Sequence, residues 1–343
     1  MRHARKCFLL VIACVCLTGC ISNKEAVKTA ALKKEEKIKI GMSFDSMVIE
    51  RWQKDRDIFV STAEEMGAEV NVQNANGDSK EQIDQIEYLI EKKMDVIVII
   101  AVDAEELKPV VKKAKDEGIY VIAYDRLLAD ADADLYITFD NAQVGRLMAA
   151  SLIENVGDDG RIAAIYGSPT DNNVKLVQES FEEEIAKTNI QILYRTYAEG
   201  WLAETGYLSM SEWLSKDRAI DGVLCGNDDV AREVIRALSV YRLAGRVAVV
   251  GQDADAAACQ KVVEGIQTMT VYKPVSELAK KAAKYSVMLA KGETLDINDT
   301  FDDGTYQIPY CALEPIAVTK ENMDDTVIAD RFHSPDEVYL NVE

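Results

Sequence analysis

The alternation of strand-like and helix-like segments constrains the fold of this 343-residue chain more than any other feature of its sequence. From residue 38 onward, short runs of β-branched residues take turns with longer amphipathic segments. Residues 95–101 are apolar after the first, a pattern typical of a parallel strand that is buried on both faces. Such alternation predicts right-handed βαβ units on a parallel sheet.

Two series of this kind follow one another along the chain. The first predicts strands over 39–44, 69–74, 95–101 and 119–124, with helices over 48–66, 80–92 and 104–117. The second predicts strands over 161–166, 190–194, 220–225, 247–251 and 268–272, with helices that include 171–187 and 228–243. A last helix is expected over 275–291, followed by short extended pieces. We therefore predict an α/β fold of two doubly wound, Rossmann-like lobes.

The first 20 residues form a segment apart from this pattern. A basic start precedes an apolar run over 7–17, which is too short to span a bilayer and fits a secretory signal. The run ends in LTGC at 17–20, which resembles a bacterial lipobox and so implies that Cys20 is lipidated. A plain secretory signal with a chance cysteine is the alternative. Residues 21–37 are polar and rich in lysine, and we expect a flexible tether that holds an extracytoplasmic protein at a membrane surface.

Charge and residue usage exclude several classes of function. The formal net charge is −20, so phosphate backbones repel the chain and no nucleic-acid partner is expected. The two histidines, His3 and His333, lie at opposite ends, which disfavours histidine zinc sites and Ser-His-Asp hydrolysis. Past the signal, Cys225, Cys259 and Cys311 are too widely spaced for a disulfide framework, and we expect buried apolar residues. The sequence predicts no catalytic residue, metal or cofactor.

Polar side chains gather where the predicted strands end, which is where open parallel sheets bind ligands. The candidates are Arg51, Trp52, Asp125, Arg126, Asp171, Asn173, Trp201, Asn227, Asp253 and Lys273. Carboxylates accept hydrogen bonds, cations donate them and amides do both, which matches the hydroxyls of a sugar. Indole faces cover the apolar faces of a pyranose ring. Since no Gly-rich phosphate loop is present, the pattern predicts a neutral, polyhydroxylated ligand.

Each candidate also has a purely structural explanation. Arg51 could pair with Asp55 on one helix face, and Asp171 or Asn227 could cap the helix that follows it. A single tryptophan is more often a core residue, Asp125 and Arg126 could form a structural pair, and Lys273 could simply precede a helix. Their joint occurrence at successive strand ends favours binding over these alternatives.

Two acidic stretches look like metal loops. Residues 130–134 alternate Asp and Ala as a calcium loop does, but the glycine and the closing glutamate of such a loop are missing. Residues 298–304 end in glycine and also lack the glutamate. We expect a solvated turn and a loop.

Residues 37–320 resemble the periplasmic sugar-binding proteins of ABC transporters, of the ribose/galactose type. The resemblance rests on ERWQKDRDIFV at 50–60, QNANG at 73–77, AYDR at 123–126, FDN at 139–141, GSPTDNN at 167–173, GW at 200–201, GQDAD at 251–255 and QTMTVYKP at 267–274. It implies the fold of type I periplasmic binding proteins, with three hinge strands near 139–141, 272–274 and 302–314. The lobes expected from it are 38–140 plus 274–308, and 141–272 plus 309–343.

The resemblance also implies a ligand and a role for each candidate. The ligand would be a monosaccharide, D-xylose first, enclosed between the lobes. Trp52 and Trp201 would stack on opposite faces of its ring. The hydroxyls would be held by Arg51, Asp125, Arg126, Asp171 and Asn173, with Asn227, Asp253 and Lys273 completing the polar shell.

The expected partner is an ABC permease, and the alternative is a membrane sensor histidine kinase that reads the same pocket. We expect a monomer. An enzyme or a DNA-binding regulator on the same fold is disfavoured, because we find no activated nucleophile and a signal segment stands where regulators carry a helix-turn-helix. Residues 204–218 and the tail over 320–343 depart from the family pattern, and the tail is expected either to wrap the second lobe or to serve a partner.

Overall fold

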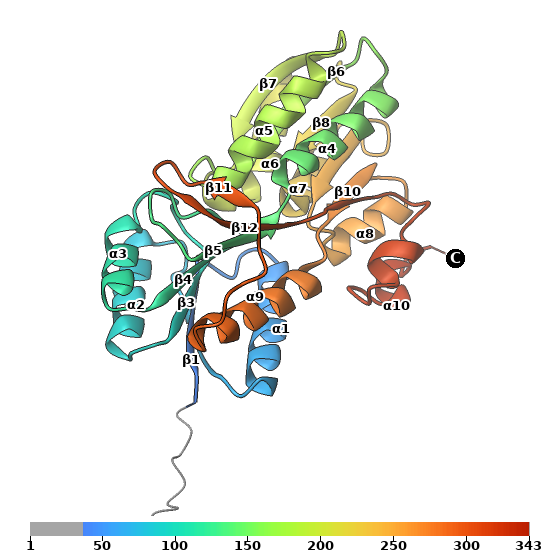
Figure 1. Ribbon diagram of the computed structural model, residues 1–343. Helices are drawn as coiled ribbons and strands as arrows, with labels where there is room; N and C mark the ends of the chain where they lie inside the picture. Colours follow the sequence, from blue (N-terminus) through green and yellow to red (C-terminus); the bar gives the residue numbers. More distant parts are fainter. Residues whose placement is uncertain (1–36, 343) are drawn as a thin grey trace, which may run out of the picture. The chain divides into compact units, whose positions relative to one another are not determined.

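The computed structural model describes residues 37–342, and the chain from Ile38 onward forms one compact unit (Figure 1). The expected signal segment 1–20, with Cys20, and the expected tether up to residue 36 lie outside the described residues. Within the described part of the chain, no helix combines the length and the apolar character that crossing a membrane requires.

The first lobe is built on a seven-stranded sheet of order β11-β12-β5-β4-β3-β1-β2. Its strands are β1 (Lys39–Phe44), β2 (Glu69–Asn74), β3 (Val96–Ile99), β4 (Tyr120–Tyr124), β5 (Leu135–Phe139), β11 (Thr300–Asp302) and β12 (Gln307–Leu313). All neighbours pair in parallel except β11 and β12. Its helices are α1 (Arg51–Glu65), α2 (Ser79–Glu91), α3 (Lys108–Asp116) and α9 (Val275–Ala290).

The central strand β3 shows why this lobe needs helices on both faces. Its side chains alternate between two apolar clusters, so that Val98 packs with Phe59 of α1 while Ile97 packs with Leu89 of α2. All four residues of β3 are fully buried, as the continuous apolar run predicts. Helices α1 and α9 lie side by side on one face of the sheet (Figure 1).

The second lobe is built on a six-stranded sheet of order β13-β10-β9-β8-β6-β7. Its strands are β6 (Arg161–Tyr166), β7 (Gln191–Tyr197), β8 (Gly222–Cys225), β9 (Ala248–Gln252), β10 (Met269–Tyr272) and β13 (Ile316–Val318), and only β13 is antiparallel to its neighbour. Its helices are α4 (Asn141–Val156), α5 (Asn172–Ile185), α6 (Glu204–Lys216), α7 (Asp228–Val240) and α8 (Ala256–Val263), with the short η1 (Glu199–Trp201) after β7. Residues 204–218, which were expected to depart from the family pattern, contain α6.

The chain crosses between the two sheets three times, so the predicted pair of doubly wound lobes with a three-strand hinge is confirmed. The crossings follow β5, β10 and β12. The boundary expected at 308 falls inside β12 and is corrected by the pairing, because β12 stays with β5 up to Leu313, opposite Phe139. The next strand, β13, already pairs with β10 of the second sheet.

Three further differences from the predicted elements have physical causes. Strand β5 has no counterpart among them, because its five residues are all buried and so short a buried run has no readable period. Helix α3 begins at Lys108 rather than 104, since the Asp103 carboxylate accepts from the backbone amides of Glu105 and Glu106 and forms a separate turn. Cys311 is half-buried, unlike the buried Cys225.

The acidic stretch over 130–134 is held by the protein itself. Lys115 pairs with Asp132 and Asp134, and the Asp303 carboxylate accepts from the backbone amides of Ala131 and Asp132 at 3.0 and 2.9 Å. Asp303 follows β11, so the stretch expected to be a loop is partly a strand. Over residues 37–342, no group of three or more His, Cys, Asp or Glu side chains has the arrangement to hold a metal ion.

The tail packs on the second lobe, the first of its two expected roles. It contains η2 (Asp324–Ile328) and α10 (Pro335–Val338). Met323, Val327 and Val338 are fully buried in a cluster with Val262 of α8. In Figure 1 α10 lies beside α8.

Candidate functional site

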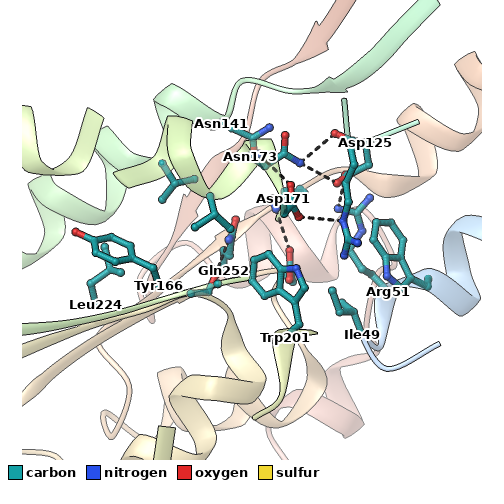
Figure 2. A pocket seen from close by; sticks show the side chains of 18 residues that line it. Ile49, Arg51, Asp125, Asn141, Tyr166, Asp171, Asn173, Trp201, Leu224 and Gln252 are labelled. Carbon is teal, nitrogen blue, oxygen red and sulfur yellow. Dashed lines mark hydrogen bonds and ion pairs between the residues drawn. The ribbon is translucent and has the colours of Figure 1, made fainter. Parts of the chain in front are cut away.

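A pocket lies between the lobes, at the carboxyl ends of the strands of both sheets (Figure 2). The cavity between the lining side chains has a volume of about 30 Å³, so these side chains nearly fill the space between the lobes. Nine of the ten predicted residues line it: Arg51, Trp52, Asp125, Arg126, Asp171, Asn173, Trp201, Asp253 and Lys273.

Asn227 is the predicted residue that does not line the pocket. Its Oδ1 accepts from the backbone amide of Val230 at 3.0 Å and caps α7, so the structural explanation holds for it. Its neighbour Gly226 lines the pocket instead. A Cβ at Gly226 would lie 2.5 Å from the backbone nitrogen of Gly167, so a glycine is needed where these two loops meet.

The pocket also includes residues outside the ten candidates. Asn141 and Gln252 add amides, and the apolar part of the wall comes from Ile49, Tyr166, Val174, Val177 and Leu224. Asn141 comes two residues after the end of β5, and Gln252 is the last residue of β9. The rule that ligands bind beyond strand ends therefore points to both amides once β5 is recognised as a strand.

Arg51 is the buried centre of the first lobe's contribution. Its Nη1 donates to Asp125 Oδ2 at 2.9 Å, while Nη2 and Nε donate to Asp55 at 2.9 and 3.1 Å. The Tyr124 hydroxyl donates in turn to the Asp55 carboxylate. Burial opposes the charged form of Asp125, but the Arg51, Lys273 and Arg126 cations hold the pKa of its carboxyl below the ordinary value. Asp125 is thus an ionised acceptor at neutral pH.

Arg126 joins the two lobes. Its Nη1 donates to Asp45 Oδ2 and to the carbonyl of Ala101, both at 2.9 Å, and its Nε lies 2.9 Å from Asp171 Oδ2 of the second lobe. Asp171 also caps α5, accepting from the backbone amide of Asn173 at 2.9 Å. The capping role and the site role therefore coexist in one carboxylate.

A second bridge between the lobes runs through Asn173. Its Nδ2 donates to Asp125, at 3.0 Å to the backbone carbonyl and 3.2 Å to Oδ1. The hydroxyl of Tyr136 donates to Asn173 Oδ1 at 3.1 Å, which fixes the orientation of the amide. Figure 2 shows Asn173 and Asp125 turned toward one another across the pocket. The lobes are therefore in direct contact at the site.

The two indoles come from opposite lobes. Trp52 lies on α1, with the Arg51 guanidinium carbon 4.5 Å and that of Arg126 5.8 Å from its ring centroid, which are cation–π distances. Trp201 follows β7 and packs directly over Gly167, where a Cβ would lie 2.2 Å from the ring. Both rings are almost completely buried, at 1% and 8% exposure.

Three pocket residues have left-handed backbone conformations that side chains rarely adopt: Asp125, Trp201 and Asp253, with φ of 62°, 59° and 96°. Such conformations cost on the order of 1–3 kcal/mol each and persist where the surrounding structure imposes them. All three residues line the pocket between the lobes. Their clustering at one pocket supports a binding role.

Several polar atoms of the pocket are buried without a hydrogen-bond partner among the described residues. They include the donors Trp52 Nε1, Trp201 Nε1 and Arg126 Nη2 and the acceptor Gln252 Oε1. An unpaired buried polar atom costs about 1–3 kcal/mol, so such atoms need an explanation. A ligand that both accepts and donates, as hydroxyls do, would satisfy them.

The charges of the lining balance. Arg51, Arg126 and Lys273 stand against Asp125, Asp171 and Asp253, and Lys273 Nζ lies 3.1 Å from Asp253 Oδ1. Because cations and carboxylates compensate each other, the pocket suits a neutral ligand better than an ionic one. The arrangement suits a neutral ligand that lies between the rings of Trp52 and Trp201.

Comparison with known proteins identifies the family. Residues 40–294 match the family described as periplasmic binding protein domain. The chain belongs to this family of periplasmic binding proteins. A D-xylose-binding periplasmic protein of Haemophilus influenzae is 46% identical over 88% of this chain and 92% of its own length. A D-xylose-binding periplasmic protein of Escherichia coli is 43% identical over 94% of this chain and 98% of its own length.

A solved structure supports the same assignment. An ABC transporter solute-binding protein of Clostridium phytofermentans, with bound β-D-glucose, superposes with a TM-score of 0.80 at 26% identity, over 88% of this chain and 99% of that one. The expected fold of a type I periplasmic binding protein is thereby confirmed. These relatives are named as binding proteins, which confirms the prediction that this family member is not an enzyme.

Proposed function

We propose that this periplasmic binding protein captures a monosaccharide, D-xylose first, between its lobes and delivers it to an ABC importer. The observation that carries the proposal is the set of unpartnered donors and an unpartnered acceptor in a charge-balanced pocket between Trp52 and Trp201. The names of the relatives from Haemophilus influenzae and Escherichia coli support D-xylose as the first sugar to test.

The proposed roles follow the geometry of the pocket. Trp52 and Trp201 bracket the sugar ring, one from each lobe, and the hydroxyls bind the polar groups between them. Arg126 Nη2 donates to a hydroxyl, while the other guanidinium nitrogens of Arg126 hold Asp45 and Asp171. Asn227 Nδ2 is also buried without a partner among the described residues, although Asn227 is not part of the pocket lining.

The test is titration calorimetry of residues 21–343 with D-xylose, after unfolding and refolding to remove any carried-over sugar. We expect selective binding tighter than roughly 10 μM, about −7 kcal/mol, with ribose, arabinose, glucose and galactose as controls. Folded protein that gives no heat with any aldose contradicts the proposal. So does turnover of the sugar by pure protein.

An arginine variant tests the pocket itself. Arg126→Lys keeps the charge but loses the planar fork that reaches Asp45, Asp171 and the ligand together. We expect D-xylose affinity to fall about 100-fold. The matched control is Arg232→Lys on the exposed side of α7, where affinity is expected to stay within twofold. Equal affinity of the two variants would refute the assigned role of Arg126.

We further propose that the protein is extracytoplasmic and anchored by lipid on Cys20. The LTGC tetrad at 17–20 and the periplasmic relatives support this location. Cells fed a labelled fatty acid are expected to label the full chain but not a Cys20→Ala variant, which should leave the membrane fraction. Label retained by Cys20→Ala, or wild-type protein without label, contradicts the anchor.

The partner is tested by co-purification from membranes with D-xylose present. Recovery of a permease with its ATPase supports the importer. Recovery of a membrane histidine kinase instead assigns the sensing role to the same pocket. The matched control is the same co-purification without D-xylose.

A further inference from the structure

The C-terminal tail is attached to the second lobe by several polar contacts as well as by its apolar cluster. The Tyr272 hydroxyl at the end of β10 donates to Asp330 Oδ2 at 2.7 Å. Gln260 of α8 donates to the carbonyl of Glu337 at 2.8 Å, and His333 Nε2 lies 2.8 Å from the carbonyl of Ala254. The tail is therefore packed onto the second lobe by polar and apolar contacts.

One residue of the first lobe reaches this tail. Lys54 of α1 places its Nζ 2.6 Å from the backbone carbonyl of Phe332, 3.8 Å from the centroid of the Phe332 ring and 3.4 Å from His333 Nδ1. Lys54 is half-buried, and neither it nor Phe332 or His333 lines the pocket. This is a contact between the lobes outside the ligand site.

The chemistry of the contact assigns the state of His333. An ammonium group can only donate, so Nδ1 accepts from Lys54 and the proton resides on Nε2, which donates to Ala254. The Phe332 carbonyl and ring supply an acceptor and a negative aromatic face for the same ammonium. The tail thus offers three favourable partners to one cation.

Both ends of the contact are attached to pocket residues. Lys54 follows Arg51 by one turn of α1, and Ala254 directly follows Asp253. The Arg126–Asp171 pair and the Lys54–Phe332 contact both join the first lobe to the second. Contacts made only in the closed state raise apparent affinity by increasing the fraction of molecules that are closed.

We propose that residues 329–338 act as a strap that holds the lobes closed through Lys54 and so sets how long the sugar stays bound. The proposal rests on the proposed function, because it concerns the lifetime of the closed, sugar-bound state. It assigns the tail a role in ligand retention.

The test is Lys54→Met in residues 21–343, which keeps the chain length and removes the ammonium. We expect the D-xylose dissociation constant and its dissociation rate, followed by tryptophan fluorescence, to rise about tenfold. The order of preference among sugars and the melting temperature without sugar are expected to stay unchanged. Lys54→Arg should restore most of the affinity, since it keeps a cation at the strap.

The matched control is Arg56→Met, which makes the same charge change on the same helix but breaks only an exposed pair with Asp57. Affinity is expected to stay within twofold. Phe332→Leu keeps the apolar packing and removes the aromatic face, so it should weaken D-xylose binding less than Lys54→Met does. The double variant should bind D-xylose about as weakly as Lys54→Met alone, because both changes remove parts of one contact. Lys54→Met with wild-type affinity and dissociation rate overturns the strap, and so does a loss shared by Arg56→Met.

A distance measurement keeps the strap testable whatever the ligand is. Spin labels at Lys112→Cys and Lys216→Cys, both exposed and one in each lobe, report the lobe separation in a Cys311→Ser background. Lys54→Met should shift the distribution toward longer distances than the wild-type chain. A wild-type chain that binds no aldose defeats the proposed function, whereas unchanged distances defeat the strap alone.

Discussion

At the scale of single residues, structural and binding roles coincide. Arg51 does pair with Asp55, and Asp171 does cap a helix, as the structural alternatives predict, yet both side chains line the pocket. Burying a charge costs several kcal/mol unless it is paired, so a buried site must contain internal ion pairs before any ligand arrives. The presence of an internal partner therefore does not argue against a binding role. Asn227 shows the opposite case, in which only the capping role is realised.

Gly167 tests whether the position of Trp201 matters for binding. In Gly167→Ala the new Cβ would lie 2.2 Å from the Trp201 ring, so the indole must move out of its place in the pocket. We expect D-xylose affinity to fall at least about tenfold by calorimetry, with a stability loss of about 1–3 kcal/mol from overpacking.

The control for this change is Gly118→Ala, a glycine at φ of 79° with no atom near its Cβ position. It is expected to cost about 1 kcal/mol of stability through its backbone and to leave affinity unchanged. If Gly167→Ala binds D-xylose as the wild-type chain does, the stacking role of Trp201 is wrong.

At the scale of elements, helix starts decide what reaches the pocket. Helices α4, α5 and α7 are capped by Asp140, Asp171 and Asn227, which lie in the loops that follow β5, β6 and β8. Helix α1 has no side-chain cap and begins with two pocket residues instead. A loop that leads from a strand into a helix can therefore cap the helix, line the pocket or do both. Which of these it does depends on which of its atoms face the pocket.

Caps inside and outside the pocket should behave differently. Asp78 caps α2 by accepting from the backbone amide of Glu81 at 3.0 Å, and neither residue lines the pocket. Asp78→Ala is expected to lower the free energy of unfolding by about 1 kcal/mol and leave D-xylose affinity unchanged. Asp171→Ala should lower both the free energy of unfolding, measured by urea unfolding, and the D-xylose affinity, measured by calorimetry. Equal loss of affinity in the two variants would contradict the placement of the site.

At the scale of the whole molecule, buried carboxyl groups make the free energy of unfolding depend on pH. Asp228 and Asp255 are buried close to one another at the pocket side of the second sheet, where the Asp255 amide donates to Asp228 Oδ2 at 3.2 Å. Burial raises the pKa of Asp228 to about 8, and burial together with the Asp228 charge raises that of Asp255. The folded chain therefore keeps a proton here that the unfolded chain releases.

The sign of the pH effect follows from this. A raised carboxyl pKa stabilises the fold fully below the unfolded value, 3.8, and the stabilisation is lost as pH rises toward about 8. In Asp228→Asn this loss is absent. The stability of the variant relative to wild type should therefore increase by about 1 kcal/mol per pH unit across that window, measured by urea unfolding. A pH-independent difference would show that Asp228 folds ionised.

Local sequence patterns predict the two doubly wound lobes and most of the pocket residues. Both follow from local patterns: alternation predicts βαβ units, and parallel sheets place the residues after strands at one edge. Nine of ten candidates therefore line the pocket. The exceptions arise where a local pattern is silent, as in the short buried β5, or ambiguous, as in the capping residue Asn227.

The way in which the two lobes meet depends on tertiary packing. The bridges from Arg126 to Asp171 and from Asn173 to Asp125 depend on the angle at the hinge, which no segment encodes alone. The contact between Lys54 and Phe332 joins residues 278 positions apart. Such contacts arise from the packing of complete lobes, whereas periodicity reports only neighbours within one helix or strand.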